Sequence, residues 1–260
     1  MKLMFNYKEL ILSSARIYTI PWVGKNQTNL EEYRYRSAVL KFPKKNNSHL
    51  FLFNLQTFEH KPYLEILSKD ENDRLKKIML QEEKKIRTKS RILLRLVLAG
   101  YLNISPSKIT FIYGKNGKPK LKTSFKKISF NVSHSLNHLA VLVDSYRDIG
   151  VDIESETKQN QVITDLAKRF FIPEEFKIIM NSSEAKRSIL FNRIWTLKEA
   201  VLKSSGIGIS NIEKAPDFSF LIKKNIDSNL QYYTTKKFKG YTFHTNKFCL
   251  STSVKKNNEL

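Results

Sequence analysis

Two acidic residues lie two positions apart in a stretch that otherwise resembles a buried strand. Residues 149–154 read IGVDIE, so Asp152 and Glu154 alternate with Val151 and Ile153. On a pleated strand the two acids project from one face and the two aliphatic side chains from the other. A solvated edge strand explains this pattern, but a hard divalent cation would also turn the repulsion between the two carboxylates into attraction. The stretch therefore predicts either an exposed strand face or a metal site.

A second candidate site lies on the helix predicted for residues 184–204. One stripe of that helix is apolar, and the other consists of Asn192, Thr196, Glu199 and Lys203. An ordinary salt bridge between Glu199 and Lys203 would be worth only about 0.2–0.5 kcal/mol. If the helix lies beside IGVDIE, however, three carboxylates and one ammonium group meet. Such a cluster suits a metal-bound pyrophosphate, because Mg²⁺ is usually held by a few carboxylates together with substrate phosphates.

The stretch FNVSHS at residues 130–135 supplies a third set of polar groups. Ser133 and His134 are suitable donors to a phosphate, although a lone histidine is more often part of a core or a turn. His138 follows four residues later, but a strand and turn do not give the helical spacing of a zinc site. We therefore expect no zinc here.

Alternating strand and helix patterns indicate how these groups are positioned. Strands are predicted at 50–56, 109–113, 128–135, 139–144, 149–154, 231–245 and 247–254, and helices at 69–103, 160–170, from 173 and at 184–204. Residues 113–121 predict a tight turn, and SYRD at 145–148 predicts a hairpin connection. We expect an α+β fold of two similar lobes, each a small antiparallel sheet with a long helix. The predicted divisions are an N-terminal extension at 1–49, an N-terminal lobe at 50–147 and a C-terminal lobe at 148–255.

Composition restricts the class of protein. The chain of 260 residues has 46 Lys and Arg against 24 Asp and Glu, a net charge of +22, which indicates a polyanionic partner or substrate. The single cysteine, Cys249, excludes an intramolecular disulfide and a cysteine-based zinc cluster. The N-terminus has no uninterrupted apolar segment, and the longest apolar stretch, at 92–102, is too short to span a bilayer. These features predict a cytoplasmic protein with no membrane association.

Four short motifs occur in a particular order: GKP at 117–119, FNVSHS at 130–135, GVDIE at 150–154 and WTLKEAVLK at 195–203. Their order and spacing resemble the 4'-phosphopantetheinyl transferases, specifically the larger, pseudo-duplicated surfactin-type branch. The resemblance covers about residues 50–255. It implies transfer of the phosphopantetheine arm of coenzyme A to a serine of an apo acyl or peptidyl carrier protein, with release of 3',5'-ADP. This is the activity of a holo-[acyl-carrier-protein] synthase, and it implies Mg²⁺ or Mn²⁺ as the cofactor.

The resemblance also implies residue roles. Asp152, Glu154 and Glu199 match the metal ligands; Glu199 also matches the base, and Lys203 matches the lysine on the pyrophosphate. The implied coenzyme A-binding residues are Arg74, Arg87, Arg91, Gly117, Lys118, Pro119, Ser133, His134 and Lys203. The partner is expected to be acidic around the modified serine, and Phe170, Phe171 and Phe176 could contact it or belong to the core. Because one chain supplies both lobes, we expect a monomer.

Two other classes remain compatible with the charge. A nucleic-acid-binding protein explains +22, but the chain has no zinc-finger or RNP signature and no obvious helix-turn-helix, so we expect no nucleic acid. A Mg²⁺-dependent nuclease could use strand acids with a lysine. Glu199 and Lys203, however, are four apart on a helix rather than two apart on a strand.

Overall fold

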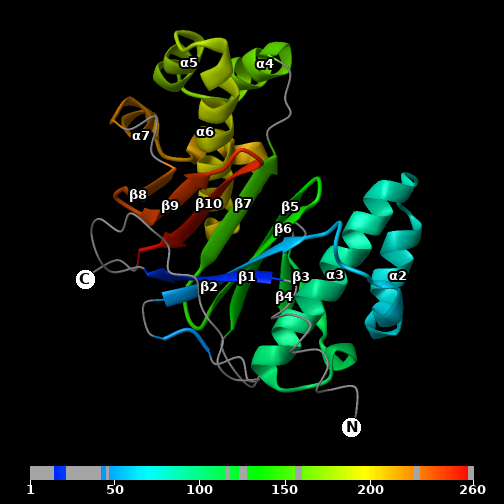
Figure 1. Ribbon diagram of the computed structural model, residues 1–260. Coiled ribbons are helices and arrows are strands. Elements are labelled where there is room, and N and C mark those ends of the chain that lie inside the picture. Colours follow the sequence, from blue (N-terminus) through cyan, green and yellow to red (C-terminus); the bar gives the residue numbers. More distant parts are fainter. Residues whose placement is uncertain are drawn as a thin grey trace.

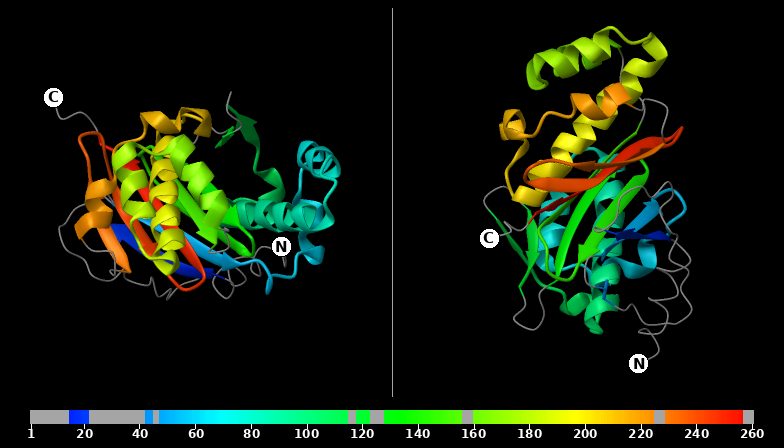
Figure 2. Two further views of the ribbon diagram at one scale, coloured as in Figure 1. Left: turned by 90° about the horizontal axis from the view of Figure 1, so that it is seen from above. Right: turned by 90° about the vertical axis from the view of Figure 1, so that its left-hand side faces the viewer.

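The structure, a computed structural model, describes residues 15–21, 42–44, 47–114, 118–122, 128–155, 160–224 and 229–256. Two four-stranded antiparallel sheets pack face to face, and each carries a long helix on its outer face (Figure 1). The views in Figure 2 place the helices of the two halves at opposite ends of the molecule, with the strands between them. The predicted α+β fold of two similar lobes is confirmed.

The first sheet has the strand order β1 (Ala15–Pro21), β2 (Asn47–Asn54), β6 (His138–Asp144) and β5 (Ser129–Ser135). Helix α3 (Gln81–Leu102) covers its outer face through a core of aliphatic and aromatic side chains. The lobe also contains η1 (Lys61–Ile66), α2 (Lys69–Lys76), η2 (Pro106–Lys108) and a ladder of β3 (Phe111–Tyr113) with β4 (Pro119–Leu121). Because β1 pairs with β2, part of the predicted N-terminal extension is a strand of this sheet.

The second sheet has the order β7 (Ile149–Ser155), β10 (Phe248–Lys255), β9 (Phe238–His244) and β8 (Leu230–Thr234). Helix α6 (Glu184–Ser205) lies on its outer face, and α4 (Asn160–Phe170) and α5 (Pro173–Met180) pack beside α6. The segments η3 (Ile209–Lys214) and α7 (Ser219–Lys224) complete the lobe. Among the helices that the structure describes, none combines the length and apolar character that crossing a membrane requires.

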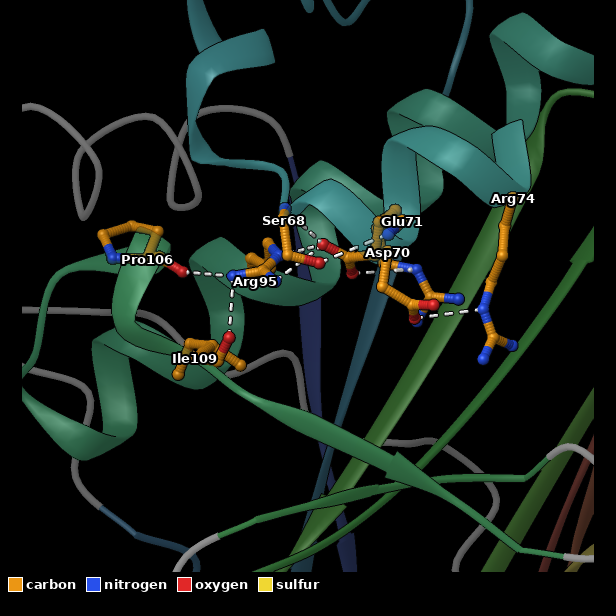
Figure 3. Close-up of polar contacts among 8 residues, drawn as sticks. Ser68, Asp70, Glu71, Arg74, Arg95, Pro106 and Ile109 are labelled. Atoms are coloured by element: carbon orange, nitrogen blue, oxygen red, sulfur yellow. Dashed lines mark hydrogen bonds and ion pairs between the residues drawn. The ribbon is translucent and has the colours of Figure 1, made fainter. Parts of the chain in front are cut away.

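Both lobes join a short helix to their long helix through a buried charge pair. In the first, Nη2 of Arg95 lies 2.6 Å from Oε2 of Glu71, and the Arg95 guanidinium also donates to the carbonyls of Pro106 and Ile109 (Figure 3). In the second, Nζ of Lys198 lies 3.0 Å from Oε2 of Glu175. Helices α3 and α6 both contain 22 residues, and the two cations occupy the same position along them. A buried ion pair at the same position of the long helix in both lobes supports an internally duplicated architecture.

The prediction of one helix over residues 69–103 is wrong in one respect. The structure has two helices there, α2 and α3, separated at residues 77–80. In one continuous helix, Glu71 and Arg95 would lie about 36 Å apart, at about 1.5 Å per residue. The chain instead folds back after α2, which brings the two side chains into contact. Pairing across the core therefore overrides the helical pattern of the intervening residues.

The predicted hairpin at 145–148 is also wrong. Strand β6 pairs with β2 and β5, whereas β7 pairs with β10, so this connection leads from one sheet to the other. The carboxylate of Asp144 accepts hydrogen bonds from the backbone N–H groups of Tyr146 and Arg147 and from the Arg147 guanidinium. These bonds hold the turn and direct the chain into the second sheet.

Candidate active site between the two lobes

Asp152 and Glu154 alternate with buried aliphatic side chains along β7, as the pattern of IGVDIE predicts, and Asp152 faces helix α6. Val151 and Ile153 are buried in the core between the sheets, while Asp152 faces Lys203. Nζ of Lys203 lies 2.6 Å from Oδ1 of Asp152 and 3.9 Å from Oε2 of Glu199. The Asp152 side chain is only 5% exposed, so a solvated strand face does not describe this residue.

Gly150 allows this close approach between strand and helix. A Cβ atom at Gly150 would lie 1.9 Å from the carbonyl oxygen of Ala200 and 2.6 Å from the backbone nitrogen of Ser204. Because both are backbone atoms of α6, a side chain at Gly150 could be accommodated only by moving the helix. The glycine of GVDIE therefore sets the distance between the acids of β7 and the polar stripe of α6.

The ammonium group of Lys203 stays charged in this setting. Burial by itself would lower its pKa, but the carboxylates of Asp152 and Glu199 outweigh that effect, and the pKa of Lys203 is raised. The site therefore contains a fixed positive charge between carboxylates. Such a charge suits a pyrophosphate oxygen.

Strand β5 of the first lobe runs beside β7, and its polar side chains bridge the two sheets. Oδ1 of Asn131 accepts a hydrogen bond from the Val151 backbone N–H at 2.8 Å. The hydroxyl of Ser133 donates to Oδ1 of Asp152 at 2.7 Å and accepts from Lys203 at 3.1 Å. The functional groups of both lobes therefore meet along this seam.

His134, between these seam residues in the sequence, is half-buried. Burial lowers the pKa of its imidazole, and the positive charges of Arg87 and Lys203 lower it further. The ring is therefore neutral at pH 7 and is suited to donate one hydrogen bond rather than to carry charge. Arg87 on α3 is bonded to Glu83, and half of its side chain is exposed.

A cleft of about 290 Å³ opens at this seam. Its lining includes Asn131, Glu199 and Lys203 together with Lys118 and Pro119 of the predicted GKP loop. The ammonium of Lys118 donates to the carbonyl of Lys203 at 2.6 Å and to that of Ile149 at 3.4 Å. Lys118 thus ties the β4 segment of the first lobe to the end of α6. Gly117 lies outside the described residues.

Two of the predicted basic residues of α2 and α3, Arg74 and Arg91, lie beside the β3 strand. The guanidinium of Arg74 lies 3.9 Å from the centroid of the Tyr113 ring and is bonded to Asp70 (Figure 3). Arg91 lies 5.9 Å from the same ring, and its Nε lies 3.3 Å from Oε1 of Glu71. Both cations are therefore held in place by partners on α2.

The phenylalanines considered as partner contacts pack inside the second lobe. Phe171 is buried and stacks on Phe191, while Phe170 lies edge-on to Trp195. Phe176 is partly buried against the same cluster. Of the two interpretations, the structure favours the core.

A divalent cation fits the acids of β7. Oδ2 of Asp152 is buried and has no hydrogen-bond partner among the described residues, whereas Oδ1 is bonded to Ser133 and Lys203. An unsatisfied buried carboxylate oxygen suits a hard cation, and Mg²⁺ needs only one or two carboxylates besides substrate phosphates. Within the described part of the chain, no group of three or more His, Cys, Asp and Glu side chains is arranged to hold a metal.

Comparisons with known proteins agree with this arrangement. A family model described as the 4'-phosphopantetheinyl transferase superfamily matches residues 148–255, and one described as the N-terminal region of 4'-phosphopantetheinyl transferase matches residues 55–145. Together they span both lobes and the seam between them. The chain belongs to the 4'-phosphopantetheinyl transferase superfamily.

Several relatives carry the same name. The chain is 37% identical to 4'-phosphopantetheinyl transferase HetI of Nostoc sp. over 150 residues. The aligned stretch covers 57% of this chain and 63% of the relative. A putative 4'-phosphopantetheinyl transferase of Synechocystis sp. is 36% identical, with 57% and 60% covered. The transferase Sfp of Bacillus subtilis is 26% identical, with 58% and 66% covered. The matched stretch thus spans less than two thirds of each of these relatives.

Three residues of the site had no role assigned from the sequence. Asn131 and Ser135 belong to the FNVSHS stretch, and Gly150 precedes the acids. Asn131, Ser133 and Ser135 alternate, and such alternation places them on one face of a strand. That pattern could have indicated a polar strand edge, although its partner strand was not predictable.

Proposed function

We propose that the protein transfers the 4'-phosphopantetheine arm of coenzyme A to a serine of an apo carrier protein and releases 3',5'-ADP. One observation carries this proposal: Asp152 and Lys203 of the second lobe bond Ser133 of the first lobe, and Lys203 lines the cleft at this seam together with Glu199. Membership of the transferase superfamily favours this activity over nucleic-acid binding or nuclease activity. The relatives HetI and Sfp, which are named 4'-phosphopantetheinyl transferases, support the surfactin-type branch.

The reaction is a phosphoryl transfer. The hydroxyl oxygen of the carrier serine forms a bond to the phosphorus that bears pantetheine, and the bond from that phosphorus to the bridging pyrophosphate oxygen breaks. The electron pair of the broken bond remains on 3',5'-ADP, and the serine proton passes to Glu199, directly or through water. A weak base is sufficient, because the transition state of such transfers is loose. Lys203 supports the charge that develops on the pyrophosphate.

The remaining groups bind and orient coenzyme A. His134 contacts a phosphate oxygen, and Lys118 and Pro119 lie beside the adenine. Arg74, Arg87 and Arg91 receive the 3'-phosphate. Support comes from Lys118 and Pro119 in the lining of the cleft, and from Arg74 and Arg91 beside Tyr113 of the β3 strand.

A divalent cation completes the proposed site. Asp152 and Glu154, with Glu199, would hold Mg²⁺ or Mn²⁺, and the bound cation would neutralise charge on the pyrophosphate. The buried and unsatisfied Oδ2 of Asp152 supports this assignment.

The net charge of +22 favours an acidic acyl or peptidyl carrier protein as the partner, because opposite charge accelerates encounter. We propose that the enzyme acts as a monomer, since both lobes of one chain line the cleft. We also propose that it acts in the cytoplasm, a reducing compartment that suits a chain with a single cysteine.

The test mixes the protein with an apo carrier protein, fluorescent coenzyme A and Mg²⁺, and measures label on the carrier serine. We expect labelling by the unaltered protein and its loss in Asp152→Ala. Asp165→Ala is the matched control, because Asp165 is an exposed acid of α4 bonded to Gln161. Absence of label together with tight, salt-dependent DNA binding would overturn the proposal.

A further inference from the structure

We propose that Ser133 and Ser135 of β5 are positioning residues that orient the carboxylates of Asp152 and Glu154 toward a divalent cation. The inference rests on the proposed function for its metal, but it assigns a different task to the serines of FNVSHS. They act on the acids of the other lobe.

The hydrogen bonds along the seam form a ladder of side chains. Asn131, Ser133 and Ser135 alternate along β5, and each is bonded to a successive part of β7. The hydroxyl of Ser135 donates to Oε2 of Glu154 at 3.2 Å and accepts from the backbone N–H of Ser155 at 3.1 Å. Because Ser133 bonds Asp152 in the same way, each serine of the ladder holds one acid.

While these bonds persist, the Ser133 hydroxyl cannot donate a second hydrogen bond. A serine hydroxyl has one proton to donate. That proton lies on the 2.7 Å bond to Oδ1 of Asp152, and the hydroxyl oxygen accepts from Lys203. In this arrangement the Ser133 proton is therefore given to the acid of the other lobe.

The same bonds determine which oxygen of Asp152 faces a cation. Ser133 and Lys203 both contact Oδ1, at 2.7 and 2.6 Å, which leaves Oδ2 as the buried oxygen without a partner. A carboxylate held through one oxygen presents the other in a single direction. Partners of this kind, behind the ligands themselves, typically contribute about 10- to 100-fold to metal affinity.

The experiment measures Mn²⁺ affinity by electron paramagnetic resonance of the free ion, in the full-length protein and without coenzyme A. We expect Ser133→Ala to raise the Kd for Mn²⁺ by about 10- to 100-fold. Ser135→Ala should raise it less, because its bond to Glu154 is longer. Ser133→Thr keeps the hydroxyl and should restore affinity to within about threefold of the unaltered protein.

Ser48→Ala is the matched control. Ser48 is a fully buried serine that donates to the carboxylate of Asp144 at 2.5 Å, far along the chain from the proposed metal site. It should lose stability in thermal unfolding as Ser133→Ala does, yet bind Mn²⁺ normally. This comparison separates a positioning role from a general loss of fold.

Two results would overturn the inference. One is an unchanged Mn²⁺ affinity in folded Ser133→Ala with a raised KM for coenzyme A, which would make Ser133 a substrate contact. The other is absence of Mn²⁺ binding by the unaltered protein. Carrier labelling, measured on the same preparations, tests the proposed function separately, because a protein that binds Mn²⁺ in a Ser133-dependent way and labels no carrier would refute only that function.

Discussion

Replacement of Gly150 with alanine tests whether the contact between β7 and α6 sets the geometry of the site. The new Cβ would lie 1.9 Å from the carbonyl oxygen of Ala200 and 2.6 Å from the backbone nitrogen of Ser204. Ordinary contacts between such atoms begin near 3.4 Å, so α6 must move away by roughly 1.5 Å. The backbone of a helix cannot rotate out of the way as a flexible side chain can.

This shift acts on residues that flank the contact. Glu199 precedes Ala200 by one residue and Lys203 follows it by three, so both move with the helix. The 2.6 Å bond between Lys203 and Asp152 would break. Overpacking of this kind costs about 1–3 kcal/mol of stability, and a misplacement of about 1 Å near the chemistry costs about 10²-fold in rate. We expect both losses in Gly150→Ala.

The assay combines carrier labelling with urea unfolding. Gly114→Ala is the matched control, because among the described residues a Cβ at Gly114 would meet one atom, the carbonyl oxygen of Lys118, at an ordinary contact distance of 3.8 Å. This variant should keep the stability and labelling rate of the unaltered protein within about twofold, as surface substitutions usually do. A labelling rate of Gly150→Ala within threefold of the unaltered rate would refute the reasoning, because α6 would then not be held at this distance by the glycine.

Three further predictions concern the charge pairs and basic groups. Lys198→Met should lower the free energy of unfolding by about 3–5 kcal/mol at pH 7.5, because it leaves the Glu175 carboxylate buried without its cation; burial already raises the pKa of Glu175. The double variant with Glu175→Gln should recover most of this loss in urea unfolding, and a single-variant loss below 1 kcal/mol would contradict the pairing. Burial, only partly offset by Asp144, lowers the pKa of His49 from 6.5 to about 4, so stability is complete above pH 6.5 and declines as pH falls from 6.5 to about 4. At pH 5 the loss is about 2 kcal/mol; His49→Gln should remove that part of the difference between pH 7.5 and pH 5, and an identical pH dependence would exclude His49 as its source. Arg74→Gln should raise the KM for coenzyme A about tenfold or more, the equivalent of one charged hydrogen bond, and leave the KM for 3'-dephospho-coenzyme A unchanged; an equal rise for both would place Arg74 away from the 3'-phosphate.

The positions of the acids and of the long second helix were predictable from local pattern. Alternation in IGVDIE placed Asp152 and Glu154 on one strand face, and the polar stripe of α6 placed Glu199 near Lys203. Both patterns depend only on residues a few positions apart in the sequence. The periods of a strand and a helix determine directly which of these residues share a face.

Pairing between distant segments was not predictable in the same way. The sequence favoured one helix over residues 69–103, but a bond between Glu71 and Arg95 favours two. It also favoured a hairpin between β6 and β7, but β7 pairs with β10, about a hundred residues later. Local pattern carries no information on which of several strands will be the partner.

The sequence by itself determined the chemical groups, their spacing within each element and the family that their order resembles. The tertiary structure alone decided that Ser133 gives its proton to Asp152, that Lys118 bonds the end of α6, and that Gly150 brings α6 onto β7. The physical reason is that each of these contacts joins elements separated by 19 to 85 residues. Their distances depend on how two sheets and a helix pack together, which no single stretch of the chain encodes.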